Sequence, residues 1–167
     1  LTWGTYYGGT NEDHSKSVTT DASGNVYMCG YTASTGNIAT IGAQQSNLAG
    51  GLDGFIAKFD NNGVLQWCTY YGGSDDDYLY SVACDGVGNV YASGRTLSSS
   101  GIATPLAHQT TMFGLSDAFL VKLNSSGQLK WCTYYGGFSN EYRYGVACDG
   151  SYNVYLCGAT NSGNNIA

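Results

Sequence analysis

The chain has 167 residues, a formal net charge of −6 and only six Lys and Arg residues, which are scattered singly along it. Nucleic-acid binding is therefore not expected, and because no run of eighteen apolar residues is present, neither is membrane insertion. Twenty-five glycines, fifteen tyrosines and one proline favour strands and turns over helices.

The chain is an array of internal repeats. Trp3, Trp67 and Trp131 stand 64 residues apart in near-copies of one phrase, GTYYGG after the first and CTYYGG after the other two. A fixed period of this kind means that each unit is one supersecondary module. The predicted parts are, in chain order, a leading outer strand at 1–9, a first unit at 10–73, a second unit at 74–137 and the first half of a third unit at 138–167.

Each unit contains four apolar runs of strand length. In the second unit these are residues 80–85, 89–96, 117–124 and 128–135. Short turns join the first pair and the last pair as antiparallel hairpins, whereas a loop of roughly twenty residues joins the two hairpins. Such a loop is expected to be ordered by packing or to be functional.

Four antiparallel strands per unit are typical of a β-propeller blade. A β-solenoid is the alternative, but its coils usually take shorter periods. We therefore expect an all-β fold of four-stranded blades, forming an incomplete propeller of about 2.75 blades.

Three motifs recur in fixed order: W-C-T-Y-Y-G-G, D-x-x-G-N-V-Y and D-A-F-L-V-K-L-N-x-S-G. Together they resemble the bacterial seven-bladed beta-propeller repeat family, SBBP. The resemblance covers essentially the whole chain. It implies a propeller of large secreted or cell-surface bacterial proteins, mostly without a described activity, and hence an extracellular or cell-surface location.

The D-x-x-G-N motif is interpreted as a structural turn. Asp and Asn side chains hydrogen-bond nearby backbone amides in turns, and Gly24 and Gly88 can supply a positive φ. Tyr152 replaces the glycine in the third copy, where it should cost stability or shift the turn. The turn residues are Asp21, Asp85, Asp149, Asn25, Asn89 and Asn153.

An acidic loop precedes the first strand of each unit, and its last residue is an acid in every copy. These acids are Asp13, Asp77 and Glu141. They are candidate calcium ligands, although one short loop rarely supplies the six to eight oxygens that calcium requires. The alternative is a cap or an inter-blade hydrogen bond. No other cofactor is expected.

The six cysteines occupy three repeat positions that Gly, Thr or Ser fill in other copies. Such a position is typical of a small packed site, so free buried thiols are expected, while one or more disulfides stay open as the alternative. The tryptophans and the Tyr-Tyr pairs could form an aromatic platform for sugars. Alternation along a strand makes core packing the main expectation for them.

No catalytic motif is present, so the expected function is non-enzymatic: a structural or adhesive propeller module of a large secreted or surface protein. A glycan-binding propeller is the first alternative. A hydrolase or lyase with its catalytic residues outside this chain is the second. The expected partners are other blades of the same or a longer polypeptide, and matching repeats also permit a homo-oligomer or filament.

Overall fold

The computed structural model describes residues 2–164, so Leu1 of the predicted leading strand and residues 165–167 of the predicted third unit lie outside the described residues. Within the described range the chain forms β-strands and no helix. The strands are β1 (Asp13–Thr20), β2 (Val26–Thr32), β3 (Asp53–Phe59), β4 (Leu65–Tyr71), β5 (Asp77–Cys84), β6 (Val90–Thr96), β7 (Asp117–Leu123), β8 (Leu129–Tyr135), β9 (Glu141–Cys148) and β10 (Val154–Thr160).

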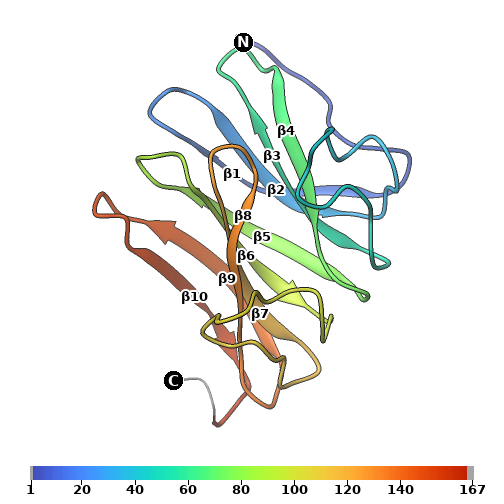
Figure 1. The fold of residues 1–167 in the computed structure, drawn as a ribbon, viewed down its shortest axis with the longest axis vertical. Helices are drawn as coiled ribbons and strands as arrows, with labels where there is room; N and C mark the ends of the chain where they lie inside the picture. The colour runs from blue at the N-terminus through green and yellow to red at the C-terminus, as the bar shows by residue number, and fades with distance from the viewer. Residues whose placement is uncertain (1, 165–167) are drawn as a thin grey trace.

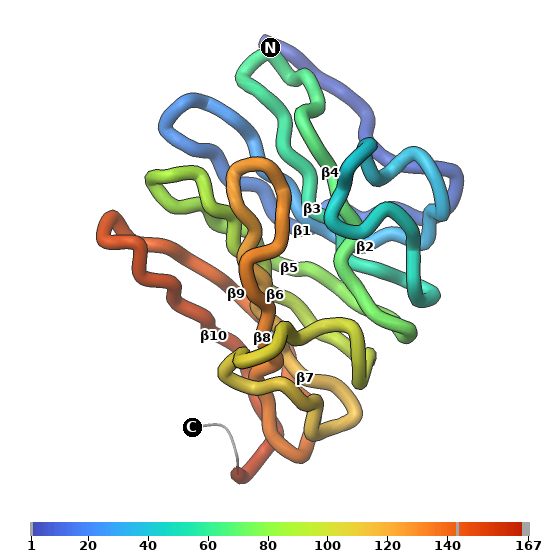
Figure 2. Tube along the Cα trace, viewed as in Figure 1, coloured from blue at the N-terminus to red at the C-terminus, as the bar shows by residue number. Residues whose placement is uncertain are grey.

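The strands form three antiparallel sheets in chain order. β1 to β4 make blade 1, β5 to β8 make blade 2, and β9 with β10 make the first half of blade 3. The sheets succeed one another like an open fan, and β5 contacts both β1 and β9 (Figures 1 and 2). The predicted all-β fold of four-stranded blades is confirmed, and the sheets do not close into a ring.

Strand boundaries follow the apolar runs closely in blade 2. The exception is β5, which begins at Asp77 rather than at Tyr80. Asp77 pairs with Thr96 at the start of the ladder, and the register then shifts at a β-bulge between Leu79 and Ser81. Because a bulge interrupts the alternation of side chains, the sequence pattern does not indicate the first three residues of this strand.

The leading segment differs from the prediction of an outer strand at 1–9, because its described residues, 2–9, form no strand. The segment nevertheless lies against blade 1 as β4 lies against blade 2. The Tyr7 hydroxyl donates to the Ile38 carbonyl at 2.7 Å, and the Tyr71 hydroxyl donates to the Ile102 carbonyl at the same distance. β4 and β8 pair with the third strand of their blades, whereas residues 2–9 pair with no described strand, so their backbone forms no ladder.

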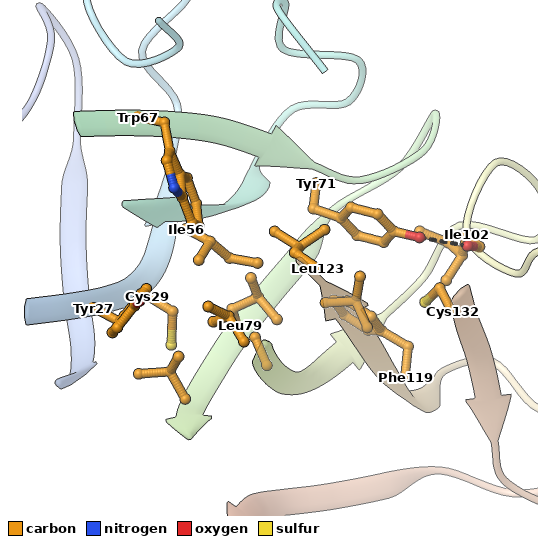
Figure 3. Close-up of a cluster of buried hydrophobic side chains, with 14 of the residues drawn as sticks. Tyr27, Cys29, Ile56, Trp67, Tyr71, Leu79, Ile102, Phe119, Leu123 and Cys132 are labelled. Atoms are coloured by element: carbon orange, nitrogen blue, oxygen red, sulfur yellow. Dashed lines mark hydrogen bonds between the residues drawn. The ribbon is translucent and has the colours of Figure 1, made fainter. Parts of the chain in front are cut away.

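The core lies between blades. Figure 3 shows side chains of blade 1, such as Tyr27 and Ile56, facing Leu79, Phe119 and Leu123 of blade 2. All five side chains are fully buried. Trp67 extends this contact, because its indole N–H donates to the Ser125 carbonyl of blade 2 at 3.0 Å. Each blade therefore buries its apolar faces on its neighbours.

Candidate functional site

The three turn aspartates make one repeated set of hydrogen bonds. Asp21 Oδ1 accepts the backbone N–H groups of Ser23 and Asn25 at 2.9 and 3.0 Å, and its Oδ2 accepts the Asn25 amide and the Tyr27 hydroxyl at 2.8 and 3.0 Å. Asp85 and Asp149 repeat all four bonds. The side chains of these aspartates are thus occupied within their own turns.

Hydrogen bonding also fixes the charge of these turns. The side-chain amide of Asn153, followed by its backbone N–H and the Tyr155 hydroxyl, lowers the pKa of Asp149 to about 2. The turn geometry is kept even without glycine, because Tyr152 has φ 66°, close to the 78° of Gly24 and the 85° of Gly88. Tyr152 therefore accepts a left-handed conformation and leaves the turn in place.

The three calcium candidates lie in three different blades and do not converge on one point. The carboxylate of each instead accepts two hydrogen bonds. One comes from the backbone N–H of the second glycine in the preceding Gly-Gly pair, and the other comes from the hydroxyl of a serine that follows the second strand of the blade. For Asp77 Oδ2 these donors are Gly73 N–H at 2.7 Å and Ser98 Oγ at 2.8 Å. The corresponding bonds link Asp13 to Gly9 and Ser34, and Glu141 to Gly137 and Ser162.

Two of these acids meet a second carboxylate from the preceding blade. Asp53, the first residue of β3, and Asp77 both flank Gly72, where an added Cβ would lie 2.6 Å from Asp53 Cγ and 2.8 Å from Asp77 Oδ2. Asp117 and Glu141 flank Gly136 in the same way. We call these two sites the carboxylate junctions. Asp13 has no such neighbour, because no blade precedes blade 1 in the described chain.

Asp53 and Asp117 were not predicted as site residues. The signal that could have found them was their identical position in the repeat, at the start of a largely apolar strand. Asp53 orders the long loop before it by accepting the Gln45 amide at 2.6 Å and the backbone N–H groups of Ala49 and Gly50 at 2.9 and 3.1 Å. Gln45 in turn accepts the Gly72 N–H at 3.0 Å. The loop is therefore tied to the junction.

The junctions are electrostatically unusual. Asp77 is fully buried, and one of its oxygens, Oδ1, has no hydrogen-bond partner. Burial raises the pKa of Asp77 to about 6, and the neighbouring Asp53 carboxylate adds to the rise. Burial likewise raises the pKa of Asp53 and of Asp117. A junction of this kind can hold a proton near neutral pH.

Within residues 2–164, no group of three or more His, Cys, Asp or Glu side chains is placed to hold a metal ion. The carboxylate junctions bring together two acids each. Calcium would need several further oxygens, and the junction oxygens that have partners are already bound to backbone amides and hydroxyls.

All six cysteines are free thiols, so the disulfide alternative is not realised. Cys29, Cys68 and Cys132 are buried, as expected of small packed positions, and burial raises the pKa of each to about 12. Cys84 and Cys148 are only half-buried and Cys157 is exposed, so the expected burial holds for three of the six thiols. Thiol chemistry is therefore suppressed at the three buried sites.

The Trp and Tyr-Tyr motif of β4 in blade 1 packs in the core rather than forming a surface platform. Trp67 is 9% exposed, while Tyr70 and Tyr71 are 1% and 4% exposed. Both tyrosines are buried because both faces of the sheet are covered. Tyr6 of the leading segment is fully exposed.

The blades and their repeated contacts define a β-propeller repeat protein with an open stack of sheets. The family model for the SBBP beta-propeller repeat matches residues 2–38 and 66–102, which are equivalent positions of two successive repeats. These matches confirm, for the two stretches, the resemblance to the SBBP repeat family that the motifs predict. No curated protein matches the chain. The described residues include no helix able to span a membrane.

Proposed function

We propose that this chain is a non-enzymatic structural and adhesive module of a large secreted or cell-surface bacterial protein, and that it acts through blade-to-blade contacts. The observation that supports the proposal is that apolar side chains which are buried in the inner parts of the stack are exposed at the equivalent repeat positions of its two ends. An exposed apolar face of this kind is typical of an interaction surface.

The first end is the free face of blade 1. Val82 and Val146 are 5% and 8% exposed because the preceding blade covers them, whereas the equivalent Val18 is 64% exposed. The covering blade also supplies a hydrogen bond, from the Val82 N–H to Ser17 Oγ at 3.3 Å, which recurs from Val146 to Ser81 at 3.1 Å. A hollow of about 390 Å³ opens beside Val18, lined by Tyr7, Met28, Phe55 and Phe59 among others.

The second end is the free face of blade 3. Tyr27 and Tyr91 are 0% and 2% exposed and pack beside Trp67 and Trp131 respectively. The equivalent Tyr155 is 56% exposed. Val18 and Tyr155 therefore mark the free sides of blade 1 and blade 3.

The occupant that fits both faces is another blade of the same repeat, from the same or a longer polypeptide or from a second copy. Head-to-tail contact between copies is heterologous, so it closes a ring or extends as a filament. Full burial of one valine or aromatic side chain contributes about 1.5 to 3 kcal/mol, so several such positions together support a stable contact.

Sedimentation velocity over a wide concentration range tests the self-association form of this proposal. We expect the wild-type chain to associate with increasing concentration. Val18→Glu should abolish association, since it places a charge in the contact. Val87→Glu is the matched control, because Val87 is 63% exposed in the β5–β6 turn of blade 2 and so belongs to neither end blade. A wild-type chain that stays monomeric throughout, or equal association of both variants, would contradict self-association.

The secreted or cell-surface location is a separate part of the proposal and rests on the family resemblance. Fractionation of the source bacterium with an antibody against the chain tests it. Recovery of the protein in the cytoplasmic fraction alone would contradict this location.

A further inference from the structure

A continuous row of aromatic rings crosses the three blades along their first strands. His14 and Tyr31 lie 4.7 Å apart between ring centroids, Tyr31 and Tyr78 4.9 Å, Tyr78 and Tyr80 6.1 Å, and Tyr80 and Tyr144 6.5 Å. Four of the rings come from β1, β5 and β9, which pack on one another, and Tyr31 comes from β2. We call these five residues the inner aromatic row.

The row is built from positions at which the repeats differ. His14 is replaced by tyrosine in the later units, Lys16 aligns with Tyr80 and Tyr144, and Tyr31 aligns with Arg95. The neighbouring motifs are nearly identical in the same units. Stacking of the blades therefore does not require these side chains, and they are available for a separate role.

Cations accompany the rings without carboxylate partners. Lys16 Nζ lies 4.9 Å from the centroid of the Tyr31 ring, and Arg95 stands opposite Tyr78 in the β5–β6 ladder. Burial raises the pKa of Tyr80, and the nearby Arg95 charge opposes that rise. Within the described residues, the one ion pair joins His14 to Glu12, so neither Lys16 nor Arg95 is paired.

Two buried polar atoms at the end of the row have no partner in the described structure. They are Arg95 Nε and the hydroxyl of Tyr144, a residue that is only 7% exposed. Leaving such groups unsatisfied is costly, and a guanidinium is suited to a planar anion such as a carboxylate. The buried pair therefore indicates a ligand that supplies a negatively charged acceptor and a hydroxyl contact.

A hollow of about 890 Å³ opens at these atoms. Tyr80, Arg95, Tyr142 and Tyr144 line it, together with Gly145, Cys157 and Ala159. Tyr80 also makes no hydrogen bond to a described residue, so its hydroxyl is available in the hollow. A few convergent polar groups on an otherwise aromatic wall are the usual composition of a binding site.

We propose that the inner aromatic row and Arg95 form a binding site for an acidic oligosaccharide with a uronate carboxylate. The Arg95 guanidinium binds the carboxylate, the free Tyr80 and Tyr144 hydroxyls bind sugar hydroxyls, and the ring faces contact the apolar faces of successive sugar rings. This site borders the free face of blade 3, because Gly145 occupies the repeat position at which Ser17 and Ser81 contact the next blade. Titration measures ligand binding and sedimentation measures association, so the failure of one proposal is distinguishable from the failure of the other.

The chemistry favours this ligand over two others. A neutral oligosaccharide contacts the rings but leaves the buried Arg95 Nε without an anion. A nucleic acid brings a dense row of phosphates to a chain whose net charge is −6, and among its described side chains the inner aromatic row has two unpaired cations beside it. A uronate oligosaccharide offers a carboxylate to the Arg95 guanidinium and presents the apolar faces of its sugar rings to the aromatic side chains.

Isothermal titration with oligogalacturonate, cello-oligosaccharide and adenosine monophosphate tests the proposal on the wild-type chain. We expect oligogalacturonate to bind, with at least tenfold higher affinity than the other two. Arg95→Gln should reduce that affinity at least tenfold, since it removes the charge and the guanidinium donors while leaving a polar side chain. Tyr144→Phe should reduce it several-fold, because it removes only the hydroxyl.

Lys130→Gln is the matched control, because it removes one positive charge from an exposed position on the outer strand β8. It should bind oligogalacturonate as the wild type does, and thermal melts should show that all three variants are folded. The proposal is overturned if oligogalacturonate does not bind, if the neutral sugar or the nucleotide binds as tightly, or if Arg95→Gln and Lys130→Gln have equal effects.

Discussion

Asp77 should make the stability of the protein depend on pH between about 4 and 6. Its pKa is about 6 in the folded protein and 3.8 ordinarily, because burial disfavours the carboxylate. At 1.36 kcal/mol per pH unit, this rise corresponds to about 3 kcal/mol. The side chain is 0% exposed, so solvent does not screen the effect.

The sign follows from proton binding. The folded chain binds this proton more tightly than the unfolded chain does, so the free energy of unfolding is highest below the unfolded pKa of 3.8 and falls as pH rises to about 6. Asp77→Asn has no proton to lose at this position. Between pH 4 and pH 7 the unfolding free energy of the variant should therefore fall by about 3 kcal/mol less than that of the wild type.

Urea unfolding at a series of pH values measures this slope. Asp13→Asn is the matched control, since Asp13 occupies the equivalent position in blade 1, is only partly buried and accepts hydrogen bonds at both oxygens from Gly9, Thr32 and Ser34. The control should keep the slope of the wild type. If Asp77→Asn also keeps that slope, the assignment of a buried proton to this junction is wrong.

Two backbone predictions follow from the repeats. Gly94→Ala should lower the free energy of unfolding by about 3 kcal/mol, because its Cβ would overlap the Tyr78 carbonyl. Gly36→Ala should change it little, since nothing lies within 4 Å of the added atom. Equal urea midpoints for the two variants would contradict the packing argument. Tyr152→Gly should stabilise the β9–β10 hairpin by about 0.5 to 1 kcal/mol in urea unfolding or amide exchange, because it relieves a φ of 66°. Gly88→Ala should lower stability by a similar amount, and a loss of stability in Tyr152→Gly would refute the strain.

The blades were predictable because their signals are local and repeated. The 64-residue spacing of Trp67 from its copies set the period, and short polar turns separated apolar runs of strand length. The start of β5 was missed because the bulge after Leu79 breaks the two-residue alternation. The prediction of a strand at residues 2–9 was wrong for a different reason. A strand needs a neighbouring strand to pair with, and sequence periodicity does not show whether one is present.

The carboxylate junctions could not be predicted from local pattern. Asp53 and Asp77 belong to different blades, and their carboxylates meet at Gly72, directly after the end of β4 at Tyr71. Arg95 and Tyr144 are likewise joined by the packing of β5, β6 and β9. The sequence supplied each residue type, whereas the register between blades decided which of them are neighbours.

Conservation between the repeats separates two kinds of residue with different physical roles. Residues that recur in every unit, such as the valine of the first strand and the tyrosine of the second, are buried wherever a neighbouring blade covers them, so duplication preserves the stacking surface. Positions that differ, including Arg95 and His14, lie along the inner aromatic row instead. Because the two sets do not overlap, a substitution such as Val18→Glu should change assembly while leaving the inner row intact, and Arg95→Gln should do the reverse. A stack of near-identical blades can therefore present one distinct surface without weakening the contacts that hold it together.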